Sequence, residues 1–325
     1  DRRQYVFVSG CSSELKNVTM GVPQGGIISP LLFSLYINDM CNSSNKLSFT
    51  HFADDTNLSI QGSNLQELEI VLNEELLRVD EWLSCNRLSL NIGKTHYMIF
   101  KGGGAEDSIN LSIRSVKLDR AEDDVVKILG LMMDNRLNFN VHVDVLCGRL
   151  SRSCGVIFRL SHCLPRRILK ILYNSVVLPR LIYCIEIWGG TGVTNMRRVS
   201  RLQDRVVKLL GTGELLKIYK ENNILPVRSL YEYFTLIKFY QQYIQSRNET
   251  LNRNIMILEP VHNYPTRFSG SLCLNTPNVK KSKIYRSFVY MGVKLWNDLP
   301  SCLRDIDSLP VFKRNIKKYI INKIC

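Results

Sequence analysis

Two runs of alternating apolar and polar residues flank a short polar centre in the segment 48–62, SFTHFADDTNLSIQG. Two phenylalanines bracket polar residues before the centre, and Leu58 and Ile60 alternate with polar residues after it. Alternation with a period of two is typical of a strand with one buried face. The segment therefore predicts a β-hairpin that carries Asp54 and Asp55 at its tip.

Apolar residues at helical spacing predict two helices around this hairpin. Ser29 as N-cap and Pro30 at the first helical position predict a helix that ends near residue 42. Asn64, with Glu67 three residues later, resembles a capping box at the start of a second helix. The side of this second helix that we expect to be buried carries Leu65, Leu68, Leu72, Leu76, Val79 and Leu83.

The pattern changes twice in the rest of the chain. Short apolar runs predict strands at 87–92, 95–100, 109–116 and 126–134. From about residue 140 the spacing is helical and is broken by prolines and glycines, with a polar loop region at 259–283 and a closing helix at 311–324. A small antiparallel sheet packed with helices, followed by an all-helical region, predicts the fold class α+β.

The composition is that of a folded protein long enough for two or three domains. The chain has 325 residues, of which 45% are hydrophobic. It contains no apolar stretch of membrane-spanning length and no signal-peptide pattern, so we expect no membrane span and an intracellular protein, in the nucleus or the cytoplasm. The chain opens inside what looks like the first strand of a hairpin, which suggests a fragment of a longer protein.

The ten cysteines are scattered along the chain and include no CxxC pair. The only near-cluster in the sequence fits no common zinc spacing, and it consists of Cys147, Cys154, His162 and Cys163. We therefore expect reduced and mostly buried thiols, rather than a disulfide framework or a zinc site.

Positive charge is concentrated in the second half of the chain. Residues 1–150 contain 14 Lys and Arg against 19 Asp and Glu, whereas residues 151–325 contain 29 against 10. In a helix predicted to begin at Thr194, cations recur every three or four residues and share one face, which carries Arg197, Arg201, Arg205 and Lys208. The phosphates of a nucleic acid would supply the matching anions, and the alternative is a merely solvated helix face.

Asp54 and Asp55 by themselves have two explanations. Aspartate is common in solvated turns, and adjacent carboxylates also suit a hard divalent cation. The earlier segment GVPQGGIISPLLF adds a second motif, because Gly21, Gly25 and Gly26 let the backbone turn tightly or approach a ligand just before a helix. This loop, the aspartate pair and a downstream lysine are far more specific together than any one of them is alone.

These motifs resemble those of the reverse transcriptases of non-LTR retrotransposons, most of all the jockey-type elements of arthropods. The resemblance rests on the family's motif B, GVPQGGIISPLLFSLYIND, its motif C, FADDT, its motif D, LSLNIGKTHYMIF, and the primer-grip strand pair with the start of the thumb, VKILGLMMDNRLNFNVHV. Near the end, FVYMGVKLWNDLP matches a tryptophan-containing stretch of the elements' C-terminal regions. The resemblance therefore touches nearly the whole chain.

The resemblance implies an RNA-directed DNA polymerase, which uses Mg²⁺ or Mn²⁺ to transfer deoxynucleotides from their triphosphates to a DNA primer on an RNA template. The metal ligands would be Asp54 and Asp55. Lys94, the lysine of motif D, would lie near the triphosphate. Contacts to the template base and the nucleotide would come from Pro23, Gln24 and Gly25, and the primer grip from Leu129 and Gly130. The duplex would be held through its phosphates by Arg197, Arg201, Arg205 and Lys208.

The resemblance also implies an order of domains: a partial polymerase palm with motifs B to E at 1–145, a helical thumb-like region at 146–225, and a basic, mostly helical C-terminal region at 226–325. The family's motif A is a strand with another metal-ligating aspartate, and nothing before Gly21 resembles it. We expect residues 1–325 to lack the fingers subdomain as well. We therefore expect residues 1–325 alone to be inactive, and the alternative function is a non-catalytic, basic nucleic-acid-binding module.

Overall fold

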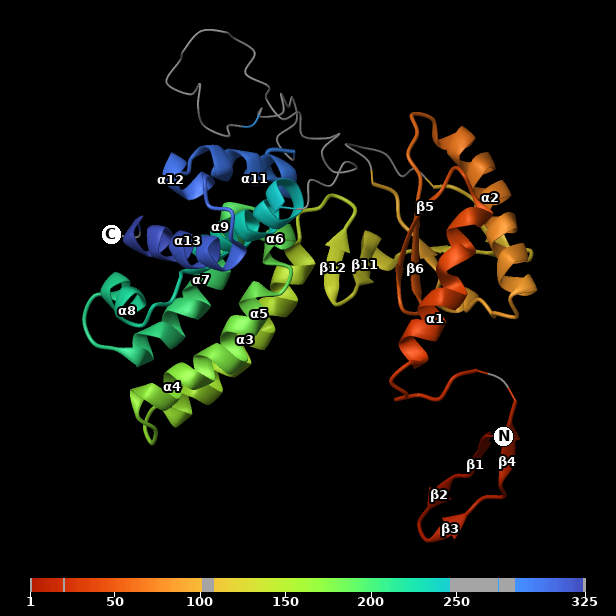
Figure 1. The fold of residues 1–325 in the computed structure, drawn as a ribbon, viewed down its shortest axis with the longest axis horizontal. Helices are drawn as coiled ribbons and strands as arrows, with labels where there is room; N and C mark the ends of the chain where they lie inside the picture. The colour runs from red at the N-terminus through yellow and green to blue at the C-terminus, as the bar shows by residue number, and fades with distance from the viewer. Residues whose placement is uncertain (1, 20, 101–107, 246–273, 275–283, 324–325) are drawn as a thin grey trace. The chain divides into compact units, whose positions relative to one another are not determined.

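The computed structural model describes residues 2–19, 21–100, 108–245, 274 and 284–323 (Figure 1). The chain divides into two compact units, unit 1 (Asp1–Ala121) and unit 2 (Glu122–Cys325). The structure thus shows one division, between Ala121 and Glu122. The domain boundaries expected at residues 145 and 225 rest on the family resemblance, and they remain a prediction.

Unit 1 contains short strands that pair two by two. They are β1 (Arg2–Gln4), β2 (Phe7–Val8), β3 (Cys11–Ser12), β4 (Lys16–Val18), β5 (Ser48–Phe52), β6 (Asp55–Ser59), β7 (His96–Tyr97), β8 (Ser112–Ile113), β9 (Val116–Lys117) and β10 (Asp119–Arg120). Four pairs are antiparallel, β1–β4, β2–β3, β5–β6 and β8–β9, and β7 pairs with β10 in parallel. The mixture of helices and small sheets agrees with the class α+β. The described strands do not join into one antiparallel sheet, because most have only two or three residues and pair with a single neighbour.

The helices of unit 1 are α1 (Ser29–Ile37), the 3₁₀ helix η1 (Asn38–Ser43), α2 (Leu65–Cys85) and the 3₁₀ helix η2 (Ile92–Lys94). The predicted start of α2 is confirmed, because the Asn64 side chain accepts from the Gln66 N–H and donates to Glu67 Oε1 at 3.1 Å. Of the leucines and valine predicted to be buried, those that are buried are Leu76, Val79 and Leu83, and the others are half-buried. They close two small cores, one with β8 and one with η1.

Several local predictions for unit 1 are wrong. The N-cap of α1 is Ile28, because the Ser29 hydroxyl donates to the Pro23 carbonyl instead of capping the helix. Residues 87–91 form no strand, and the segments 95–100 and 109–116 contain strands of only two residues each. The apolar residues of 87–92 pack on the two α2 cores from an irregular backbone, which explains their strand-like pattern.

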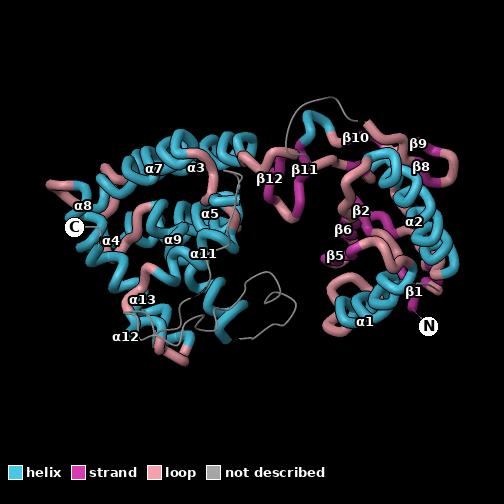
Figure 2. The backbone as a smooth tube through the Cα atoms, turned by 90° about the horizontal axis from the view of Figure 1, so that it is seen from above, coloured by secondary structure: helices cyan, strands magenta, loops and turns pink. Residues whose placement is uncertain are grey.

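Unit 2 begins with the 3₁₀ turn η3 (Glu122–Asp124) and the antiparallel hairpin β11 (Val125–Ile128) and β12 (Leu131–Asp134). Helices follow: α3 (Asn140–Leu160), α4 (Arg166–Leu172), the π-helix η4 (Tyr173–Val177), α5 (Leu178–Ile182), α6 (Ile185–Trp188), α7 (Val193–Val207), η5 (Lys208–Leu210), α8 (Leu215–Glu221), α9 (Val227–Phe239), the π-helix η6 (Tyr240–Gln245), η7 (Ile284–Arg286), α11 (Phe288–Asn297), α12 (Ser301–Arg304) and α13 (Leu309–Lys323). Figures 1 and 2 show α3 and α7 side by side.

One large core holds the helices of unit 2 together. Its largest fully buried side chains include Trp188, Trp296, Tyr173, Phe239 and Phe312. The ring of Tyr240 stacks on Phe312 with 4.4 Å between centroids, which joins α13 to the end of α9. The closing helix predicted at 311–324 is thus confirmed as α13. The polar loop region expected at 259–283 lies outside the described residues, apart from Leu274.

The described cysteines are free, as predicted, but the expectation that they are mostly buried is wrong. The exposed ones are Cys11, Cys41, Cys85, Cys163 and Cys302, and the half-buried ones are Cys147, Cys154 and Cys184. The exposed cysteines lie in short elements, at a helix end and in a turn, where little of the chain packs over them. Among the described helices, none has the length and apolar character needed to cross a membrane.

Candidate functional site

The β5–β6 hairpin carries Asp54 and Asp55 at its tip, as the alternating pattern predicts. Phe52 pairs with Asp55, so that Ala53 and Asp54 form a two-residue turn, in which Ala53 has a φ of 52°. Both carboxylates are exposed. The turn therefore holds two adjacent negative charges in solvent at the end of a closed hairpin.

The chemistry of this tip fits a hard divalent cation. Mg²⁺ prefers oxygen ligands, keeps several waters and often takes only one or two protein carboxylates together with substrate phosphates. Asp54 and Asp55 supply that number of carboxylates. Within the described residues, no three or more His, Cys, Asp or Glu side chains gather to hold a metal ion by themselves. A metal ion at this tip would thus need further ligands, from water, from a phosphate or from another segment.

The loop before α1 is tied into a compact turn. The Gly26 N–H and the Ser29 hydroxyl both donate to the Pro23 carbonyl, at 3.3 and 2.7 Å. Gly25 has a φ of 82°, which favours glycine, and a Cβ on Gly26 would lie 2.5 Å from Ser29 Oγ. Gln24 is exposed in the middle of the turn. The glycines are thus required by the turn, and they leave the Gln24 side chain accessible to a ligand.

Lys94 lies on the single turn of η2. The sequence pattern predicts a strand at 95–100, directly after it. β7 begins only at His96. The backbone N–H of Lys94 donates to the Asn91 carbonyl at 3.1 Å, and its side chain is exposed. Its backbone is therefore fixed by a turn while the ammonium group extends into solvent.

Leu129 and Gly130 form the two-residue turn between β11 and β12, with φ values of 47° and 90°. The prediction that they lie on a strand is therefore wrong. Positive φ at both turn positions suits the twist of a hairpin. The Tyr183 hydroxyl donates to the Leu129 carbonyl. Behind the turn, His142 Nδ1 accepts from the Met132 N–H at 3.4 Å, and burial lowers the pKa of His142, which favours the neutral ring that can accept. Two aromatic side chains thus anchor this hairpin to the helices.

The four cations of the predicted stripe are all exposed on α7 and η5, and they are Arg197, Arg201, Arg205 and Lys208. The opposite face of α7 is buried through residues that include Val199, Leu202 and Val206. Within the part of the chain that the structure describes, none of the four cations forms an ion pair. The predicted cap at Thr194 is wrong, because the helix starts earlier, with Gly192 as N-cap and its carbonyl accepting from the Met196 N–H.

Polar contacts fix α7 against α3 along its length. Three hydrogen bonds of 2.7, 2.6 and 3.4 Å join, in chain order, Asn140 to Asn195, Asp144 to Arg198 and Cys154 to Leu202. Because the partners advance in the same order on both helices, α3 and α7 run parallel. This packing holds α7 with its cationic face toward solvent.

Residues 2–133 match the family model described as reverse transcriptase (RNA-dependent DNA polymerase). This part of the chain is thus similar to reverse transcriptase domains. The aspartate tip, the glycine loop, Lys94 and the Leu129–Gly130 turn all lie inside the matched residues. The cationic stripe of α7 lies beyond them.

Proteins similar to the chain include polymerases and Pol polyproteins of mobile elements. The RNA-directed DNA polymerase from mobile element jockey of Drosophila funebris is 25% identical over 218 residues, which is 64% of this chain and 23% of that protein. The probable RNA-directed DNA polymerase from transposon X-element of Drosophila melanogaster is 25% identical over 211 residues, 63% of this chain and 23% of that protein. The Pol polyprotein from type-1 retrotransposable element R1 of Bradysia coprophila is 27% identical over 197 residues, 58% of this chain and 19% of that protein.

The match thus spans about a quarter or less of each of these curated relatives. It is also longer than the part of the chain that matches the reverse transcriptase model, so the similarity continues into unit 2. No solved structure gives a significant match to the chain.

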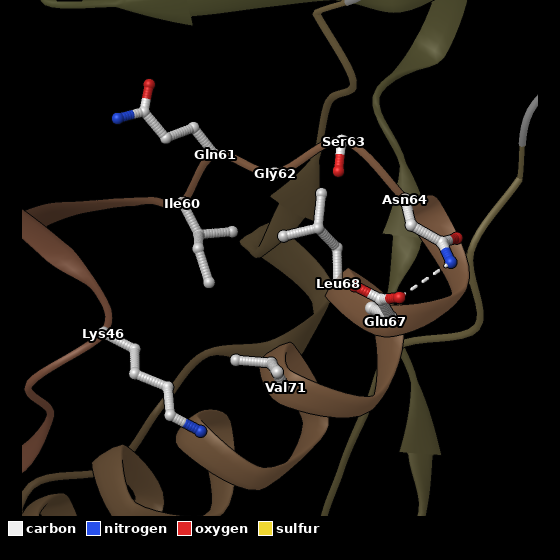
Figure 3. Close-up of a pocket in the computed structure, with 9 residues that line it drawn as sticks. All are labelled: Lys46, Ile60, Gln61, Gly62, Ser63, Asn64, Glu67, Leu68 and Val71. Carbon is white, nitrogen blue, oxygen red and sulfur yellow. Dashed lines mark hydrogen bonds between the residues drawn. The ribbon is translucent and has the colours of Figure 1, made fainter.

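Unit 1 also has a cavity of about 330 Å³, beside the segment that joins β6 to α2 (Figure 3). Residues 60–64, Lys46 and the first turns of α2 line it. The Lys46 ammonium lies 3.9 Å from Glu74 and 3.7 Å from Glu75, so its charge is already matched. None of the predicted site residues lines this cavity, and we assign it no role.

Sequence reasoning missed the residues that support the site. Tyr183 is 54 positions from Leu129, and Asn195 is 55 positions from Asn140. Neither pairing has a local signal, because a hydrogen bond between distant residues leaves no periodicity in the sequence. Only the folded arrangement of unit 2 brings these pairs together.

Proposed function

We propose that residues 1–325 are part of an RNA-directed DNA polymerase of a non-LTR, jockey-like mobile element. The observation that carries the proposal is the pair Asp54–Asp55 at the tip of the β5–β6 hairpin, inside the part of the chain that matches the reverse transcriptase family. The names of the relatives, RNA-directed DNA polymerases from mobile elements, support the same function.

In this proposal, Asp54 and Asp55 would hold Mg²⁺ or Mn²⁺, which would supply charge stabilisation for nucleotidyl transfer to a primer 3′-hydroxyl. Gln24, on the turn tied by Pro23 and Gly25, contacts the template base and the incoming deoxynucleoside triphosphate. Lys94 donates a proton to the departing pyrophosphate. The exposure of all these groups supports the assignment, because a polymer substrate can reach each of them.

Unit 2 holds the template and primer. The turn at Leu129 and Gly130 supports the primer, and the cations of α7 contact the phosphates of the duplex. Residues 146–225 then serve as a thumb, and the basic region 226–325 adds further charge. The exposure of the α7 cations and their lack of ion pairs among the described residues support this assignment.

The small number of metal ligands favours a second function, which is binding of nucleic acid without catalysis. The described residues bring only two carboxylates to the hairpin tip, and nothing before Gly21 resembles motif A. In-line transfer demands accurate placement of both metals, and small errors in position already cost activity. We therefore propose that the polypeptide 1–325 alone binds template and primer without extending the primer.

A primer-extension assay on purified 1–325 tests this function. A homopolymer template, a labelled primer and Mg²⁺ are used, and binding of the same template–primer is measured in parallel. We expect binding without nucleotide incorporation. Incorporation that disappears in the double variant Asp54→Asn, Asp55→Asn would show that the polypeptide needs no further ligand. Failure to bind the template–primer at about 50 mM salt would contradict the polymerase assignment itself.

A further inference from the structure

An aromatic pair stands on the surface at the end of α3. Phe158 is 55% exposed, and the ring of His162 meets it edge to face, with 5.2 Å between centroids and 86° between planes. His162 is itself exposed, in the turn that follows α3. Neither ring belongs to the core of unit 2. The exposed ring of Phe158 is thus open to a ligand that can stack on an aromatic face.

The pair lies beside the end of the cationic stripe. On α3, Cys154 contacts Leu202 of α7, and Phe158 follows Cys154 by one helical turn on the same face. Since α3 and α7 run parallel, Phe158 is level with the end of the stripe, at Arg205 and Lys208. α4 packs against η5, the turn that begins at Lys208. The C-terminal ends of α3 and α7 and the start of α4 therefore meet at one edge of unit 2 (Figures 1 and 2).

Positive charge predominates at this edge. Arg166 and Arg167 open α4, and both are exposed, as are Arg205 and Lys208. Among the described residues, none of these four side chains forms an ion pair. No Asp or Glu occurs from residue 145 to residue 185. Cations that are not matched within the protein attract a ligand with regularly spaced anions.

We propose that this edge binds single-stranded nucleic acid, with an unpaired base on the face of Phe158 and the flanking phosphates on Lys208 and the arginines. Stacking on an aromatic ring requires a base whose face is free, and a base inside a duplex has none. Stacking also tolerates every base, so the site has no strong sequence preference. Both RNA and DNA can use it, because the contacts are to base faces and phosphates.

The position of the site within the polymerase rests on the proposed function. Phe158 lies about 27 Å along α3 from Asn140, where the helix leaves the β11–β12 hairpin. The strand held at Phe158 is then an unpaired segment of template or target nucleic acid, outside the template–primer duplex.

The test compares single-stranded and duplex ligands on the complete 1–325 polypeptide. Fluorescence anisotropy measures the affinity for labelled oligo(dT) and oligo(rU) of about 15 nucleotides and for a DNA duplex of the same length. Phe158→Ala should weaken binding of both single strands about tenfold and leave duplex binding within about twofold. Phe158→Tyr should retain the affinity, and Val156→Ala, an exposed residue on the same helix, is the matched control.

The outcomes separate the two proposals. Equal loss of single-strand and duplex affinity in Phe158→Ala, no loss at all, or a loss confined to one sugar type overturns the stacking site. If the wild-type chain binds the duplex with a steep salt dependence, and Phe158→Ala changes neither the single-strand nor the duplex affinity, only this inference fails. If the wild-type chain binds no polynucleotide, the proposed function fails as well. Competition by a polyglutamate peptide that depends on Phe158 would assign the edge to an acidic protein partner and overturn the proposal.

Discussion

The exposed stripe on α7 predicts a steep and specific dependence of nucleic-acid binding on salt. Arg197 and Lys208 are eleven residues apart, which is about 17 Å along the helix. Phosphates of one strand follow one another at about 3.4 Å along a duplex, so the stripe spans about five of them. Each of its four cations can therefore meet a phosphate of its own. The double variant Arg201→Gln, Arg205→Gln removes two of these contacts.

The magnitude follows from counterion release. Each neutralised phosphate contributes about −0.9 to the slope of log K against log salt on duplex DNA. Four contacts give a slope of about −3.6, so that affinity falls by about a hundredfold between about 50 and 200 mM salt. The double variant should retain about half of this slope. Its fold should be unchanged, because both arginines are exposed on the helix surface.

The assay is fluorescence anisotropy of a labelled duplex titrated with 1–325 at several salt concentrations. The control is a second double variant, Lys217→Gln, Arg228→Gln, which removes the same charge from cations that already face Glu221 and Glu232 at 3.9 Å. We expect the control to keep the wild-type slope. The same loss of slope in both variants would show that total charge governs binding, and it would refute the stripe as a phosphate clamp.

Three further predictions concern the stability of the two units. Gln203→Leu should lower the melting temperature measured by circular dichroism by about 6–12 °C, because the fully buried amide makes three hydrogen bonds worth about 1 kcal/mol each. Burial lowers the pKa of His142 in the folded protein, so the unfolded chain binds the proton more tightly. The free energy of unfolding should therefore fall as the pH drops below 6.5. Thermal melts of His142→Gln should show a weaker pH dependence. Gly26→Ala should displace the Ser29 hydroxyl and speed limited proteolysis of the loop, whereas Gly93→Ala, whose new methyl group meets nothing closer than 3.7 Å, should not.

The parts of the fold that follow from neighbouring residues could be predicted from the sequence. The alternation around Asp54 and Asp55 gave the hairpin and its tip, because register pairs in a tight hairpin are close in sequence. Asn64 marked the start of α2 through a bond to a backbone group two residues away. The spacing of the cations predicted one exposed face of α7, since helical geometry alone fixes it.

The parts that depend on distant residues could not be predicted. Ser29 has the residue type of an N-cap, but its hydroxyl donates to Pro23, a partner supplied by the glycine turn. The segment 87–92 has the composition of a strand, but it packs on α2 without a pairing neighbour. Tyr183 supports the turn at Leu129 through a contact that exists only after the helices of unit 2 have packed.

The central claim, that Asp54 is a metal-ligating residue of a polymerase, is tested most directly in a longer polypeptide. Residues 1–325 are fused after the fingers and motif A of a jockey-type polymerase, and primer extension and template–primer binding are measured with Mg²⁺. Asp54→Asn should abolish extension and leave binding largely intact, because it removes a metal ligand and no phosphate contact. The matched control Asp39→Asn, an exposed aspartate on η1, should extend normally. Extension by Asp54→Asn at nearly the wild-type rate would contradict the assignment.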